Sequence, residues 1–299
     1  MADASALLTA GIWGWFADPL EFEFMQRALL AVVLVGIVSA VVGAFVVVRG
    51  MAFIGDAVAH ASFAGVAGAF ALGVSIYFGA LVAAIATALG IAFISQRGRL
   101  RFDTAIGVLF AGAFALGIVI ISRQENYVSD LSSFLLGSVF GVSWGDLQLM
   151  ALLGAAAIGF IALFYKELLF TSYDATVAAA TGIPTQLIDY GLLVLIAIST
   201  VVALQAVGII LVIAMLVTPP ATASLLVNRL HYIIFVGVAV AVASATIGLY
   251  ASYYADVASG ATIVLTATAF FVAALLFAPR RGIVPRWWLG RERAKELAR

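Results

Sequence analysis

Cysteine is absent from this 299-residue sequence, and other side chains with reactive or metal-binding chemistry are scarce. Without cysteine the chain forms no disulfide, offers no thiolate to a metal and has no cysteine nucleophile. Its only two lysines, Lys166 and Lys295, follow tyrosine and alanine. A Walker A loop places its lysine after glycine and before serine or threonine. The sequence therefore excludes thiol chemistry and ATP hydrolysis by a Walker A loop.

Charge is also scarce. The 15 basic and 15 acidic residues leave no net charge and make up 10% of the chain, whereas 65% of the residues are hydrophobic. Soluble domains have about 25% charged and roughly 45–50% apolar residues. A nucleic-acid-binding protein also needs a basic patch. The composition excludes a soluble enzyme, a disordered chain and a nucleic-acid partner, and it indicates an all-α polytopic membrane protein.

Long apolar runs follow one another along almost the whole chain. A helix that spans a bilayer needs about 20 mostly apolar residues. This criterion predicts about eight to nine transmembrane helices, and nine runs qualify: 26–48, 53–72, 75–95, 103–122, 146–165, 187–204, 206–227, 231–250 and 260–278. The runs are continuous, not alternating, which disfavours a transmembrane β-barrel.

The distribution of basic residues predicts the orientation. With the N-terminus outside and the C-terminus inside, thirteen Lys and Arg residues fall on the inner side, and only Arg27 and Arg123 on the outer side. Inner loops of membrane proteins carry such an excess. We therefore expect an outer interfacial segment at 1–24, one transmembrane domain at 25–279 and a basic cytoplasmic tail at 280–299. The outer stretch 131–140 is too short to span and is either re-entrant or interfacial.

The inner connection 166–186 is longer than a simple turn and contains a predicted short helix. Asp174 is a plausible N-cap, the alanines around Ala178 favour helix, and Gly182 with Pro184 ends it. Two interpretations remain open for this helix, which Tyr173 precedes. It is either an ordinary surface helix or a docking helix for a soluble partner.

Asp56 is the acid for which the sequence offers no loop position or helix-end role, and His60 follows it by four residues. This spacing places the carboxylate and the imidazole on one helical face, one turn apart. A carboxylate oxygen and an imidazole can share a divalent cation such as zinc, iron or manganese. Two other interpretations stay open, namely a self-satisfied pair in the bundle interior and a proton relay. The other histidine, His231, is expected to be an interfacial residue.

A second irregular feature is Thr218-Pro219-Pro220. Two adjacent prolines remove two backbone donors and kink a helix. In a membrane, a broken helix is tolerated where it is buried or lines a cavity. The proline pair is therefore either a packed kink or part of a pathway wall or gate.

Several of these features occur in an order that resembles the membrane permeases of zinc/manganese ABC importers. The resemblance covers roughly residues 25–285 and rests on five blocks: 49–51 with 55–61, 102–107, 173–184, 207–212 leading to 218–223, and 259–264. One departure is the double proline, where many members have a single one. The sequences of the segments 131–147 and 218–223 resemble the manganese/iron branch of the family more than the zinc branch.

The resemblance implies a type II-like ABC importer permease in the cytoplasmic membrane of a prokaryote. It implies a homodimer that binds two ATP-binding cassette subunits inside and receives metal from an extracytoplasmic binding protein. Asp56 and His60 would be the metal ligands, and Tyr173, Asp174, Ala178 and Gly182 would belong to the coupling region. The cargo would be manganese, zinc or iron, with no cofactor bound permanently.

Two alternative functions from other classes remain open. A proton-coupled secondary metal transporter would use Asp56 and His60 as its relay and would need no ATPase. A structural membrane anchor would tolerate alanine at both positions.

Overall fold

The computed structural model describes residues 17–98, 100–123, 139–278 and 282–284. Within these ranges the chain forms eleven α-helices and two short 3-10 helices, η1 (Asp18–Glu21) and η2 (Val139–Gly141), with no strand. The predicted all-α fold class is thereby confirmed. Of the segments predicted at the two ends and in the outer connection, residues 1–16, 124–138 and 285–299 lie outside the described ranges.

Nine helices in the described part of the chain are long and apolar enough to cross a membrane, and each matches one predicted span. They are α2 (Glu23–Val48), α3 (Ile54–Leu72), α4 (Ile76–Gly98), α5 (Phe102–Ile121), α7 (Trp144–Leu163), α10 (Thr185–Val207), α11 (Ile209–Leu226), α12 (Leu230–Ala255) and α13 (Ser259–Phe277). The orientation of the termini stays a prediction.

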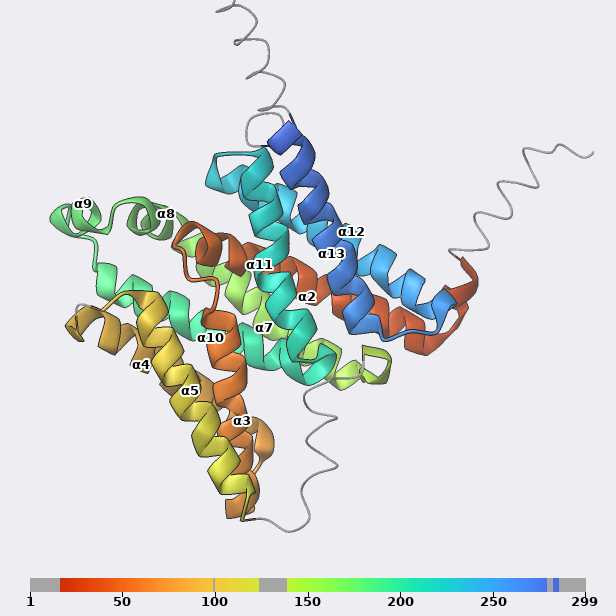
Figure 1. Cartoon of the computed structure of the whole chain (residues 1–299), viewed down its shortest axis with the longest axis horizontal. Coiled ribbons are helices and arrows are strands. Elements are labelled where there is room, and N and C mark those ends of the chain that lie inside the picture. The colour runs from red at the N-terminus through yellow and green to blue at the C-terminus, as the bar shows by residue number, and fades with distance from the viewer. Residues whose placement is uncertain (1–16, 99, 124–138, 279–281, 285–299) are drawn as a thin grey trace, which may run out of the picture.

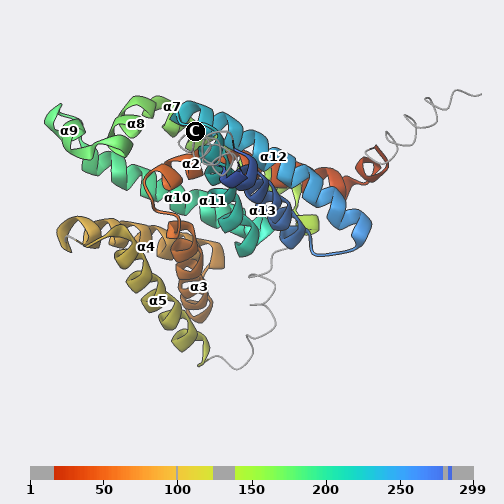
Figure 2. The same cartoon turned by 45° about the horizontal axis from the view of Figure 1, so that its top comes forward.

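The spans form two groups that meet along α10. In one group α2 packs against α7, α11 and α12, and α13 lies on α11 and α12. In the other group α3 packs against α4 and α5 (Figure 1). Figure 2 shows the same division from a second direction, with α3, α4 and α5 below the rest. Helix α10 contacts both α2 and the α3–α4 pair, so it joins the groups.

Glycine lets neighbouring helices approach to backbone distance. A Cβ atom added at Gly65 of α3 would lie 2.0 Å from the carbonyl oxygen of Gly79 of α4, and one added at Gly79 would lie 2.3 Å from that of Gly65. By contrast, an added Cβ at Gly68 would meet nothing within 4 Å. Gly65 therefore allows this close approach, and Gly68 takes no part in it.

Helix α11 continues through Pro219 and Pro220, and both prolines are buried. Because proline has no N–H, Pro220 cannot bond the carbonyl of Leu216, its usual helical partner. That carbonyl oxygen lies against α2, where a Cβ added at Gly43 would be 1.8 Å from it. On the opposite side, Gly237 of α12 faces the backbone of the proline pair. The prolines are thus packed between α2 and α12.

The connection between α7 and α10 differs from the single predicted helix. It contains α8 (Tyr165–Tyr173) and α9 (Ala175–Ala180), with Asp174 between them. The N-cap prediction is confirmed because Asp174 Oδ1 accepts the N–H groups of Thr176 at 3.1 Å and Val177 at 2.9 Å. Helix α8 was not predicted, because the apolar pattern of 166–173 merges with that of the preceding span. Both helices lie at the edge of the molecule (Figure 1).

The glycine contacts lead to a stability prediction. We expect Gly65→Ala to destabilise the fold by about 1–3 kcal/mol, the usual cost of overpacking, because two backbones would have to separate. Gly68→Ala, three residues along the same helix, should stay within about 1 kcal/mol of the parent because alanine favours helix. Apparent melting temperatures of the detergent-solubilised protein check this, and equal effects of the two substitutions would contradict it.

Candidate metal site

Asp56 and His60 face each other on the first two turns of α3. His60 Nδ1 lies 3.1 Å from Asp56 Oδ1 and 3.0 Å from the Asp56 carbonyl oxygen. The side chain of His60 is 25% exposed and that of Asp56 is 36% exposed. The predicted placement on one helical face is therefore observed, and the pair is accessible to a small ion.

The position of Asp56 corrects one premise of the sequence argument. Helix α3 begins at Ile54, so Asp56 stands in its first turn, where the helix dipole favours a carboxylate. A helix-end role therefore exists for Asp56 as it does for the other acids. Its side chain nevertheless makes no capping hydrogen bond to the N-cap and instead turns to His60.

The contacts of His60 select one neutral form of its ring. Both partners of Nδ1 are oxygen atoms that accept hydrogen bonds, so Nδ1 carries the proton. In the neutral ring Nε2 then holds the lone pair and points away from Asp56. One ion can reach both side chains only through Nδ1, which gives up its proton when the ion takes the place of the hydrogen bond to Asp56.

Two aromatic rings of α5 hold the imidazole from the side. The centroids of Phe110 and Phe114 lie 5.1 and 5.5 Å from that of His60, both nearly perpendicular to it. The two phenyl rings are parallel to each other, 6.2 Å apart. Sequence reasoning missed them, although their spacing of four residues in a predicted span was the available signal. They fix the orientation of His60 across the α3–α5 contact.

The turn of α3 that bears Asp56 is also fixed from the other side. A Cβ atom added at Gly55 would lie 2.6 Å from Cδ2 of Leu216 on α11, so α3 packs closely there. Leu216 is the residue whose carbonyl oxygen faces Gly43 of α2. It therefore joins the candidate site to the proline region of α11. Thr218 is half-buried, and a role for it and the two prolines in gating stays a prediction.

The pair by itself supplies two ligands. No group of three or more histidine, cysteine, aspartate or glutamate side chains gathers among the residues that the structure describes. His231 is exposed at the start of α12, and its ring centroid lies 4.2 Å from that of Tyr232. Its position at the membrane interface stays a prediction.

The predicted coupling residues lie together around α9. Tyr173 is 60% exposed at the end of α8, while Ala178 is fully buried. Gly182 has a φ of +87°, a left-handed conformation that glycine adopts without strain and that ends the segment. The segment 173–182 thus presents an exposed edge formed by Tyr173 and Val177, anchored by a buried alanine.

These features define a multi-pass α-helical membrane protein with a histidine–carboxylate pair in one span. The chain belongs to the ABC 3 transport family, whose model matches residues 21–278. It is 45% identical to the manganese transport system membrane protein MntC of Halalkalibacterium halodurans, over 95% of this chain and 97% of that protein. It is 36% identical to a probable iron transport system membrane protein of Haemophilus influenzae, over 90% and 99% of the two chains.

A solved structure described as PsaBC from Streptococcus pneumoniae in complex with Fab contains a similar chain. The TM-score is 0.79 and the identity 38%, with 90% of this chain and 97% of that chain covered. The resemblance drawn from the five sequence blocks is therefore confirmed at the level of the family and the fold.

The protonation of His60 can be tested directly, because the chain has only two histidines. In protein labelled with ¹⁵N-histidine, with His231→Gln to assign the signals, His60 should show a protonated Nδ1 and a free Nε2. Diamagnetic Zn²⁺ should then shift the Nδ1 resonance of His60, because the ion displaces the Nδ1 proton. A shift of His231 alone would contradict the site.

Proposed function

We propose that this chain is the permease subunit of an ATP-driven importer that carries a divalent transition metal across the cytoplasmic membrane. The observation that carries the proposal is the Asp56–His60 pair on α3 of a chain from this family. The pair holds the ion transiently during passage. Two protein ligands with water suit this task, because a transport site must release its ion as well as bind it.

Manganese is the favoured cargo, with iron and zinc as the alternatives. A carboxylate oxygen and an imidazole nitrogen fit all three ions, and the absence of cysteine removes any thiolate preference for softer metals. The relatives named for manganese include MntC of Halalkalibacterium halodurans and MntC of Listeria monocytogenes, each 45% identical. Two relatives named for iron are 36% and 33% identical, close to other relatives named for manganese at 37% and 35%.

The importer requires three partners. ATP hydrolysis belongs to separate ATP-binding cassette subunits, since the sequence has no Walker A loop. These subunits dock on the cytoplasmic α8–α9 segment, and an extracytoplasmic binding protein delivers the ion. A second copy of the chain forms the other half of a homodimer. The chain itself is a transport subunit and performs no catalysis.

Metal uptake tests the proposed site. In proteoliposomes with the cassette subunits and ATP, we expect Asp56→Asn and His60→Gln each to lower Mn²⁺ uptake about 100-fold, because even outer-shell partners of metal ligands contribute about 10–100-fold. The matched controls are Asp103→Asn and His231→Gln, which change exposed residues of the same types. They should transport normally. Unchanged uptake by both site variants would refute the assignment.

The same vesicles separate the proposal from a proton-coupled transporter, which the contact between His60 and Asp56 also fits. An importer of the proposed kind needs ATP and is insensitive to a protonophore. Uptake that proceeds without the cassette subunits and stops when the proton gradient collapses would instead favour the relay. Competition among Mn²⁺, Fe²⁺ and Zn²⁺ in this assay decides the cargo.

The docking role of α9 gives a further prediction. Val177 is 46% exposed next to the 60% exposed Tyr173, and we expect Val177→Glu to weaken binding of the cassette subunit at least tenfold, or about 1.4 kcal/mol. A carboxylate there would lose its hydration in an apolar contact. The control is Gln186→Glu, which adds the same charge at an exposed position of α10. Pull-down titrations measure both, and equal binding would refute the docking surface.

A further inference from the structure

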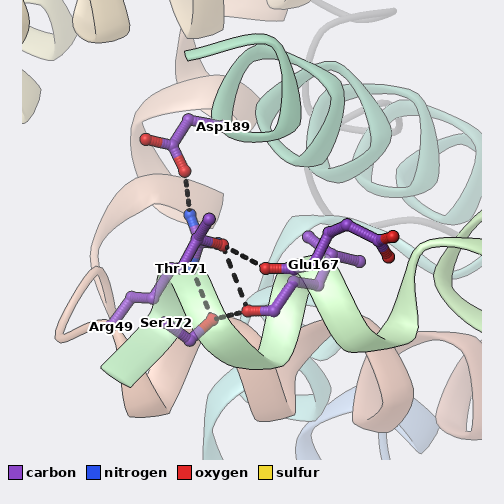
Figure 3. Close-up of polar contacts among 6 residues, drawn as sticks. Arg49, Glu167, Thr171, Ser172 and Asp189 are labelled. Atoms are coloured by element: carbon purple, nitrogen blue, oxygen red, sulfur yellow. Dashed lines mark hydrogen bonds and ion pairs between the residues drawn. The ribbon is translucent and has the colours of Figure 1, made fainter. Parts of the chain in front are cut away.

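Arg49, at the end of α2, binds side chains of two other helices at once (Figure 3). Its Nε donates to Ser172 Oγ at 2.8 Å and its Nη2 donates to Thr171 Oγ1 at 2.7 Å, both on α8. Its Nη1 forms an ion pair with Asp189 Oδ1 of α10 at 2.5 Å. We call these four residues the Arg49 clamp. They connect segments that are 122 to 140 residues apart in the sequence.

Each hydrogen bond of the clamp pairs one donor with one acceptor. The hydroxyl of Thr171 donates to the carbonyl of Glu167 at 2.9 Å, and that of Ser172 donates to the carbonyl of Leu168 at 2.5 Å. The hydroxyl oxygens therefore accept from Arg49 with their lone pairs. A planar guanidinium can reach three acceptors in this way, whereas a lysine ammonium lacks the fixed fork. The site thus requires arginine for its geometry as well as its charge.

The clamp is largely removed from solvent. The side chain of Arg49 is 12% exposed and that of Asp189 is 22% exposed. Separating a pair in this environment leaves each charge poorly solvated. Arg49 therefore moves with its partners as long as the displacement is too small to break the Arg49–Asp189 ion pair.

The clamp connects the docking segment to the turn that precedes the candidate metal site. Six residues separate Arg49 from Asp56, and among them Gly50 turns the chain with a φ of +69°. On the other side, Thr171 and Ser172 stand in the last turn of α8, directly before the exposed Tyr173 and the α9 cap Asp174. Movement of α8 thus reaches the start of α3 through one side chain and one short turn.

Helix α8 has other attachments besides the clamp. Leu168 is fully buried, and Tyr165 contacts Phe45 of α2 edge-to-face at 6.5 Å between ring centroids. These contacts keep α8 on the protein without the clamp. Loss of the clamp is therefore expected to change how α8 moves α3 more than whether the protein folds.

We infer that the Arg49 clamp transmits displacement of α8–α9 to the Asp56–His60 pair, so that Arg49, Thr171 and Ser172 are positioning residues for transport. The inference rests on the proposed function. When the cassette subunits move α8, the hydroxyl contacts move Arg49, and the α2–α3 turn carries the first turn of α3 with it. Asp189 of α10 compensates the charge of the guanidinium.

The sharpest test removes the α8 contacts and keeps the ion pair. In Thr171→Val/Ser172→Ala the Arg49–Asp189 pair remains, so the charges stay compensated. Helix α8 loses only its two hydrogen bonds to Arg49. In the assembled transporter in proteoliposomes, ATP hydrolysis and Mn²⁺ uptake are measured in parallel. We expect uptake per ATP hydrolysed to fall about tenfold, within the usual range of coupling between sites, while Mn²⁺ binding to the protein stays within about twofold of the parent.

Two arginine variants complete the test. Arg49→Lys keeps the charge but loses the fork, and it should uncouple transport as the double variant does. Arg229→Lys, the same change at an exposed arginine at the start of α12, should transport normally. If the double variant does not assemble, Ser172→Ala alone should give a smaller loss of the same kind.

Unchanged uptake per ATP in the double variant and in Arg49→Lys would overturn the inference, whatever their melting temperatures. A merely structural clamp would lower the amount of folded protein and leave the uptake per ATP intact. Failure of the proposed function is distinguishable, because in that case the parent protein itself would show no ATP-dependent Mn²⁺ uptake.

Discussion

Close contact between helix backbones is the interaction on which the rest of this structure depends. In a bilayer, apolar side chains gain little by leaving lipid for another helix, so spans associate through van der Waals packing and polar bonds. Gly43 admits the Leu216 carbonyl of α11, and Gly65 admits the backbone of α4. The double proline takes part in this packing, because Pro220 leaves the Leu216 carbonyl without its helical partner and free to lie against α2.

The same packing fixes the geometry of the candidate site. Gly55 lies against Leu216 on one side of α3, and Phe110 and Phe114 of α5 hold His60 on the other. Within the pair, His60 donates to Asp56, and both side chains remain partly exposed.

The end of α2 joins the functional segments. Helix α8 and the start of α3 are far apart in the sequence, yet Arg49 contacts α8 and directly precedes the turn into α3. In a transporter, a polar connection between α8 and the start of α3 is useful because it can carry movement from one to the other. Apolar packing alone transmits movement less specifically, because side chains in lipid-facing bundles can slide past one another.

The sequence by itself determined the nine spans, the facing of Asp56 and His60, the Asp174 cap and the end at Gly182. All of these follow from local rules of apolar length, helical spacing and backbone conformation. Only the tertiary structure decided the partners of Arg49, which the sequence assigned to the inner charge excess, and of Asp189, which it assigned to a helix dipole. It also decided the aromatic contacts of His60 and the existence of α8. These depend on contacts between distant segments, and such contacts leave no periodic signal along the chain.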